Sequence, residues 1–259
     1  MNERLLRAAP ILFGLLALIL WEAAVRVTGV PAYLVPGPVA IVRAFLADPA
    51  GLLLALGSTL TVTFAALIVA AALGAALAVT MAASRLARAA IVPWAVVLQV
   101  TPIVAIAPLI IIWVGNPFAS LVVCAVIVAF FPVFANTTTG LASVPPELAD
   151  LFVLYGAGRW RTLLLLRLPA ALPFFLSGLR ISGGLALVGA VVAEFVAGSG
   201  GFASGLAYRI LEAGYRLQIP RMFAALVLLS VAGIVINFGL GALGDFILRR
   251  RGDVPTAGA

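Results

Sequence analysis

The chain has 259 residues, of which 64% are hydrophobic and 10% charged, and its mean hydropathy is +1.25. A soluble domain does not have this composition, and strands of a membrane barrel would alternate apolar and polar residues, so most of the chain is expected to form transmembrane helices. The net charge of +7 comes from 16 basic residues, all of them arginine, against nine aspartates and glutamates. At the ends of apolar helices, arginines mark the cytoplasmic side and attract anionic lipid headgroups, which favours membrane lipids over nucleic acid as the partner.

Several residue types that support catalysis are missing. The sequence has no histidine and no lysine, and its one cysteine, Cys124, lies in an apolar run. A Cys/His metal site, a disulfide within the chain and a His-activated nucleophile therefore cannot be built, and the lysine of a phosphate-binding P-loop is absent. We expect a chain that is not an enzyme and binds no metal or cofactor itself, so that any energy from ATP must come from another polypeptide.

The apolar runs predict an all-α membrane protein of about six spans in a single domain over residues 1–259. The first run follows Arg4 and Arg7, a pattern that also describes a signal peptide. Its length, and its continuation through Glu22 and Arg26, favour a retained helix. The expected spans cover about residues 8–27, 52–83, 89–114, 118–136, 168–195 and 222–248.

Turn and breaker residues refine these spans. A turn-rich segment at residues 30–38 precedes a short amphipathic stretch that ends near Phe45. Small residues in the second span predict close helix packing. The third span carries Pro93, Pro102 and Pro108, and prolines bend helices. A glycine-rich stretch at residues 198–201 opens a loop that continues through an amphipathic segment to Pro220.

The arginines also predict orientation. With the N-terminus inside, the cytoplasmic side would hold twice as many arginines as the outside, which places both termini in the cytoplasm. The cytoplasmic set is Arg4, Arg7, Arg85, Arg88, Arg159, Arg161, Arg167, Arg249, Arg250 and Arg251.

The segment at residues 143–173 has the pattern helix, glycine turn, helix. Pro145 and Pro146 favour a helix start, Gly156 and Gly158 favour a chain reversal, and Pro169 predicts the end of a second helical stretch. Such an element on the cytoplasmic face can present a short helix to a partner protein.

This segment resembles the signature E-A-A-x3-G-x9-I-x-L-P of the permease subunits of type I ATP-binding-cassette importers. Gly156 stands for the glycine, nine residues follow, and residues 166–169 read Leu-Arg-Leu-Pro. Asp150 keeps the acid at the start, whereas Leu151 and Phe152 replace the two alanines. Features at residues 21–22, 36–38, 178–182 and 193–194 are similar to the branch that handles sulfonates, taurine, nitrate and pyrimidine precursors.

The resemblance implies a type I permease fold in a bacterial inner membrane, with the loop at about 143–169 as a cytoplasmic coupling helix. It also implies two copies of an ATP-binding subunit, which would bind ATP and Mg²⁺, an extracytoplasmic solute-binding protein, and a homodimer of permeases, with a heterodimer as the alternative. The solute could be an anion such as a sulfonate, taurine or nitrate, or a pyrimidine or vitamin precursor. The candidate coupling residues are Glu147, Asp150, Phe152, Tyr155, Gly156, Arg159 and Pro169.

Polar residues inside the spans are candidates for a solute pathway. Arg180 could attract an anionic solute or form an internal ion pair, and Glu194 near the outer helix end could gate, contact the binding protein or be solvated at the interface. For serine and threonine, helix packing and bonding to the preceding turn is the alternative. The candidates are Gln99, Thr101, Asn136, Ser177, Arg180 and Glu194.

Two other function classes remain open at this point. A stand-alone secondary transporter or channel would often show two corresponding halves and an embedded ion site. No internal repeat is visible, and only Glu22, Glu194 and Asp245 are acids in or beside the spans. A membrane enzyme would need a cluster of acid, base and nucleophile, and none is visible.

Overall fold

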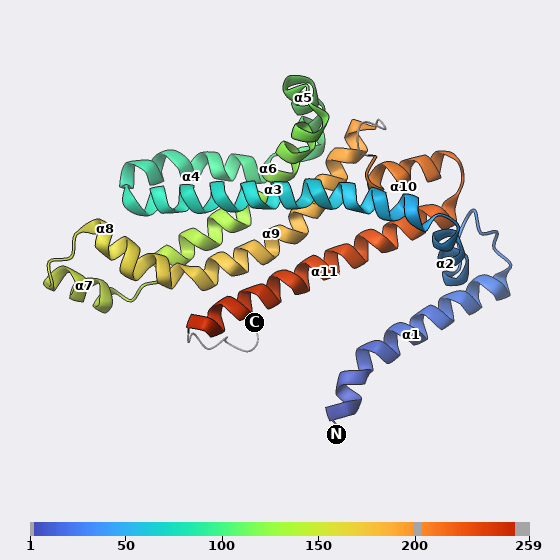
Figure 1. Ribbon diagram of the computed structural model, residues 1–259, viewed down its shortest axis with the longest axis horizontal. Coiled ribbons are helices and arrows are strands. Elements are labelled where there is room, and N and C mark those ends of the chain that lie inside the picture. Colours follow the sequence, from blue (N-terminus) through green and yellow to red (C-terminus); the bar gives the residue numbers. More distant parts are fainter. Residues whose placement is uncertain (1–2, 199–203, 252–259) are drawn as a thin grey trace. The chain divides into compact units, whose positions relative to one another are not determined.

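The computed structural model describes residues 3–198 and 204–251, with side chains from residue 9 onward (Figure 1). In these ranges the regular secondary structure is helical, which confirms the all-α prediction. The helices are α1 (Glu3–Thr28), α2 (Pro38–Ala47), α3 (Pro49–Ala83), α4 (Arg85–Val100), α5 (Ile103–Val114), α6 (Pro117–Ala142), α7 (Pro146–Leu154), α8 (Arg159–Thr162), the π-helical turn η1 (Leu163–Arg167), α9 (Leu168–Ala197), α10 (Leu206–Tyr215) and α11 (Ile219–Arg251).

The membrane-spanning candidates agree with the sequence. Within the described residues, five helical stretches are long and apolar enough to cross a bilayer, and the count becomes six if the bent pair α4 and α5 forms one span. The five are Ala9–Thr28, Pro49–Ala83, Pro117–Ala142, Arg159–Ala197 and Ile219–Arg251. The prediction of about six spans is confirmed.

The third predicted span is a broken helix. Helices α4 and α5 meet at an angle of 104°, and Thr101 between them is extended, with φ −74° and ψ 122°. The residue before a proline avoids the α-helical region, so Pro102 explains the break. Pro93 and Pro108 remain inside α4 and α5. Of the three prolines, Pro102 therefore bends the span most sharply.

The predicted helix end at Pro169 is wrong, because α8, η1 and α9 continue through it without interruption. A proline lacks an N–H and its ring clashes with the carbonyl four residues earlier. Here the preceding turn is a π-turn, in which the N–H of Leu168 donates to the carbonyl of Leu163. The wider turn gives the chain a way to accommodate Pro169 without ending the helix.

The chain divides into two compact units. The first comprises residues 1–58 and 198–230, and its core includes Leu52, Leu206 and Ile210. Asp48 caps α3 by accepting a hydrogen bond from the N–H of Gly51 at 2.9 Å, and the same carboxylate pairs with Arg221. The predicted stretch near Phe45 is α2, and the segment before Pro220 contains α10. The predicted glycine-rich loop lies largely outside the described residues.

The second unit comprises residues 59–197 and 231–259, and close contact between α6 and α9 organises it. A Cβ added to Gly140 would lie 2.8 Å from Cα of Ala171, and one added to Gly189 would lie 2.8 Å from Cα of Ala125. Glycine therefore lets the two backbones touch. The Ser182 hydroxyl also donates to the carbonyl of Ala129 at 2.6 Å.

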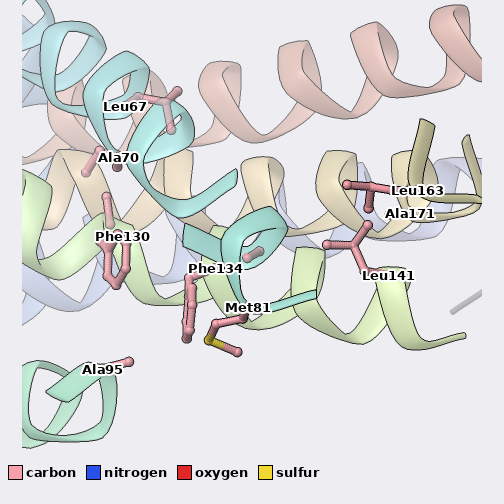
Figure 2. Close-up of a cluster of buried hydrophobic side chains, with 12 residues drawn as sticks. Leu67, Ala70, Met81, Ala95, Phe130, Phe134, Leu141, Leu163 and Ala171 are labelled. Carbon is pink, nitrogen blue, oxygen red and sulfur yellow. The ribbon is translucent and has the colours of Figure 1, made fainter. Parts of the chain in front are cut away.

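An aromatic and aliphatic core lies beside this helix pair (Figure 2). The rings of Phe130 and Phe134 stack with centroids 5.4 Å apart, and Met81 from α3 lies next to Phe134. A Cβ on Gly74 of α3 would come within 3.0 Å of the backbone nitrogen of Phe134. The small residues of α3 thus permit the close packing predicted for the second span.

Candidate functional site

Helix α7 is a short helix with no buried residue. Pro145 and Pro146 begin it as predicted, and Glu147 in its first turn complements the positive end of the helix. Val153 and Leu154 are 70% and 84% exposed, and Leu148 and Leu151 are also exposed. A nine-residue helix with this much uncovered apolar surface has the composition of a partner-binding element.

A glycine-closed turn ends α7. The N–H of Ala157 donates to the carbonyl of Phe152 at 2.8 Å, and the N–H of Gly156 donates to that of Val153 at 2.9 Å. Gly156 has φ +69°, a left-handed conformation that glycine adopts without strain. The predicted chain reversal at Gly156 is confirmed, and Gly158 then starts α8 in an ordinary extended conformation, with φ −65°.

The predicted coupling residues fall into two groups. Most lie on the exposed surface of α7, its turn or α8, whereas Phe152 and Pro169 are half-buried. Pro169 lies in α9, the helix that follows the turn, and its carbonyl accepts a weak hydrogen bond from Nη1 of Arg251 at 3.4 Å. The exposed residues are Glu147, Asp150, Tyr155, Gly156 and Arg159.

Sequence reasoning missed the apolar part of the exposed surface. Leu148, Leu151, Val153 and Leu154 are exposed together with Tyr155. The sequence signal was a group of apolar residues within one short predicted helix. Their exposure could not be predicted, because it depends on where the rest of the chain packs. Leu151, which replaces a signature alanine, therefore faces outward, while Phe152 turns partly inward.

A cleft of about 860 Å³ lies beside this turn, within the second unit. The end of α3, the start of α4, the end of α6 and the segment at residues 149–167 contribute to its walls. Arg85, Arg88, Arg159 and Arg167 line it, together with Trp160. Figure 1 shows the α3–α4 turn at the same end of this unit as α7 and α8.

Arg180 lies in the interior of the apolar helix α9. Its Nη2 and Nε donate to the same amide oxygen, Oδ1 of Asn237 on α11, at 2.9 and 3.2 Å. A Cβ on Gly241 would lie 3.4 Å from Cζ of Arg180, so the guanidinium packs over this glycine. The internal contact of Arg180 is therefore with a neutral amide, and both Arg180 and Ser177 remain exposed on α9.

Glu194 is buried, and its Oε2 accepts a hydrogen bond from the hydroxyl of Thr59 at 3.2 Å. An exposed fraction of 5% does not fit the alternative of plain solvation at the interface. Asn136 donates to the carbonyl of Pro132, four residues earlier, at 2.8 Å. Thr101 bonds in the same way to Val97 at 2.6 Å, as the alternative for threonine predicted.

The pathway candidates do not meet in the arginine-lined cleft. None of Gln99, Thr101, Asn136, Ser177, Arg180 and Glu194 lines it. Gln99 is exposed just before the bend at Pro102. The structure therefore separates an end with a short exposed helix and basic cleft from polar residues distributed along the spans.

Comparison with known proteins identifies the family. Residues 69–252 match the model of the binding-protein-dependent transport system inner membrane component. The chain is 34% identical over 250 residues to a probable ABC transporter permease protein of Haemophilus influenzae, covering 96% of this chain and 98% of that one. It is 36% identical to the riboflavin transport system permease protein RibX of Chloroflexus aurantiacus, over 91% of this chain and 87% of the relative.

A third relative is named for transport of a different solute. The formylaminopyrimidine transport permease protein ThiX of Halalkalibacterium halodurans is 34% identical over 87% of this chain and 89% of its own length. The shared part includes the α6 to α9 core, α7 and its glycine turn, since the family model covers all of them. The chain is therefore a multi-pass membrane protein that belongs to the binding-protein-dependent transport system inner membrane components, as a permease subunit of an ABC importer.

Proposed function

We propose that the chain forms one half of the membrane pathway of an ATP-driven importer and that α7 is the helix through which the ATP-binding subunit moves it. The observation that carries this proposal is an exposed α7 closed by a glycine turn with φ +69°. Family membership supports it, because binding-protein-dependent systems divide solute capture and membrane passage between subunits.

The coupling role follows from mechanics. Helix α7 joins α6 through three residues at 143–145 and joins the continuous helical stretch 159–197 through its glycine turn. Force applied to α7 would therefore reach two membrane-spanning helices that pack closely against each other. Apolar side chains such as Leu154 and Tyr155 would enter a groove of the partner, and Asp150 would accept hydrogen bonds there.

The orientation follows from charge. We place both termini, α7 and the basic cleft in the cytoplasm, where arginines are favoured. The ATP-binding subunit, with its ATP and Mg²⁺, would meet α7 on this side. The solute-binding protein would deliver its cargo to the other side, in a bacterial inner membrane.

Assembly requires more than one chain. We propose two copies of this permease, each acting as a single membrane domain, and two ATP-binding subunits, because an importer of this kind needs two membrane halves. Purification of the tagged chain from its native membrane should recover an ATP-binding subunit, and mass measurement of the intact complex should give two copies of each. A complex with a second, different permease would replace the homodimer by a heterodimer.

The solute class is proposed from chemistry and relatives. Three relatives are named as a riboflavin, a formylaminopyrimidine and a putative aliphatic sulfonates transport permease. Arg180 lies inside an apolar helix and contacts a neutral amide, so its positive charge remains available to an anion. We propose a small solute that carries a negative charge, or a vitamin or pyrimidine precursor, passing near Arg180.

Reconstituted vesicles test the division of labour. The full complex with its binding protein should import solute only when ATP is supplied. Import by the purified chain alone, without ATP-binding subunits, would overturn the proposal in favour of a stand-alone transporter or channel. Binding measurements on the cognate solute-binding protein would identify the solute.

A further inference from the structure

The cleft beside the α7 turn is lined by several arginines, and the proposed coupling role involves only Arg159 among them. Four arginines line its volume of about 860 Å³, and among the described residues no aspartate or glutamate does. Arg85, Arg88, Arg159 and Arg167 form no ion pair with the described part of the chain. Four unneutralised guanidinium groups around one cleft repel one another unless an anion enters.

The surroundings of the cleft match a membrane surface. Core residues at the ends of spanning helices also line it, including Met81 of α3 and Leu141 of α6. Trp160 lines it and is 68% exposed, as is common for tryptophan at headgroup depth. Leu164 and Leu165, on the next turn, are exposed. These two leucines do not line the cleft, but they follow Leu163, which does, along the same helical stretch.

We infer that this cleft binds the phosphate-bearing headgroup of an anionic phospholipid. Arginine pairs with phosphate oxygens through two parallel N–H donors, and a diester headgroup leaves both acyl chains free to lie along the exposed leucines. A free phosphate ester has the same headgroup chemistry but nothing to cover Leu164 and Leu165. Only the assignment to the cytoplasmic leaflet rests on the proposed orientation.

The bound lipid would join two segments that are far apart in the sequence. Arg85 and Arg88 belong to the α3–α4 turn, and Arg159 starts α8 immediately after the α7 turn. A phosphate shared between them would hold the coupling segment against the end of α3 in the plane of the membrane. Anionic lipid would therefore stabilise the permease more than a zwitterionic lipid of equal chain length.

Lipid binding to the assembled complex tests this inference. The probe is phosphatidylglycerol, compared with phosphatidylcholine, glycerol phosphate and inorganic phosphate, with retained lipid measured by native mass spectrometry and stability by thermal unfolding. The cleft variant carries R85Q and R88Q, and the control carries R161Q and R250Q, which removes the same charge outside the cleft. The cleft variant should bind phosphatidylglycerol about tenfold more weakly or worse, while the control stays near wild type.

Four outcomes would overturn the inference. An equal loss of phosphatidylglycerol binding in the cleft variant and the control would show that the arginines act only through net charge. Equal stabilisation by phosphatidylcholine would remove the role of the anion. Full stabilisation by glycerol phosphate or inorganic phosphate would assign the cleft to a soluble ester. Loss of the ATP-binding subunit from the cleft variant, with lipid retained, would assign the arginines to protein carboxylates. Assembly is scored separately, so failure of the coupling proposal remains distinguishable.

Discussion

The guanidinium of Arg180 on α9 donates two hydrogen bonds, of 2.9 and 3.2 Å, to one amide oxygen of Asn237 on α11. An arginine inside a spanning segment has an unfavourable free energy in the membrane unless it is paired or reaches water. Asn237 orients the guanidinium without neutralising it. We propose that the remaining N–H donors and the positive charge of Arg180 attract an anionic solute.

We predict that R180Q lowers import of an anionic solute by about tenfold or more, because hydrogen bonds to charged groups contribute about 1.5–3 kcal/mol. Import assays in vesicles with the complete complex would measure it. N237A is the matched control, since it removes the orienting amide and keeps the charge, and it should cause a smaller loss. Equal losses for neutral and anionic solutes in R180Q would refute attraction of the solute and indicate a structural role.

The turn after α7 gives a second prediction. A valine at Gly156 must adopt φ +69°, which costs about 1–3 kcal/mol for a non-glycine residue, so G156V should weaken docking of the ATP-binding subunit roughly five- to 150-fold or uncouple it. Solute-stimulated ATP hydrolysis by the complex would show the effect.

Gly158 provides the control for this experiment. It lies two residues further on, also has open space around it, but has φ −65° and ψ 162°, which suits valine. G158V should keep coupling close to wild type. If G156V transports and hydrolyses ATP like G158V, the conformation of this turn is not important for coupling.

The sequence predicted the glycine turn but not the break at Pro102 or the Arg180–Asn237 contact. The turn depends on neighbouring residues, whereas the other two depend on residues far apart in the chain. The reversal at Gly156 depends on a local signal, a glycine at a helix end. Pro93, Pro102 and Pro108 look alike in sequence, and tertiary context decides that Pro102 marks the break. Asn237 was not selected at all, since it lies in an apolar run 57 residues from Arg180 and only the packing of α11 on α9 brings them together.

A third prediction concerns the α6–α9 contact. A Cβ at Gly178 would lie 2.8 Å from the carbonyl oxygen of Pro132, whereas nothing lies within 4 Å of a Cβ at Gly184 on the same helix. G178A should therefore destabilise the protein by about 1–3 kcal/mol through overpacking. G184A should be neutral or slightly stabilising, because alanine favours helix. Thermal unfolding in detergent would compare them, and equal melting temperatures would contradict the close approach of these backbones.

The last prediction concerns the start of α3, in the first unit. Asp48 accepts a hydrogen bond from the N–H of Gly51 at 2.9 Å and pairs with Arg221 at the start of α11. D48A removes both interactions and should lower stability by about 1–3 kcal/mol, since a lost cap alone costs about 0.5–2 kcal/mol. D48N keeps a capping oxygen and loses the charge, so thermal unfolding should place it between D48A and wild type. If D48N melts with D48A, the ion pair rather than the cap stabilises this junction, and R221Q should then reproduce the full loss.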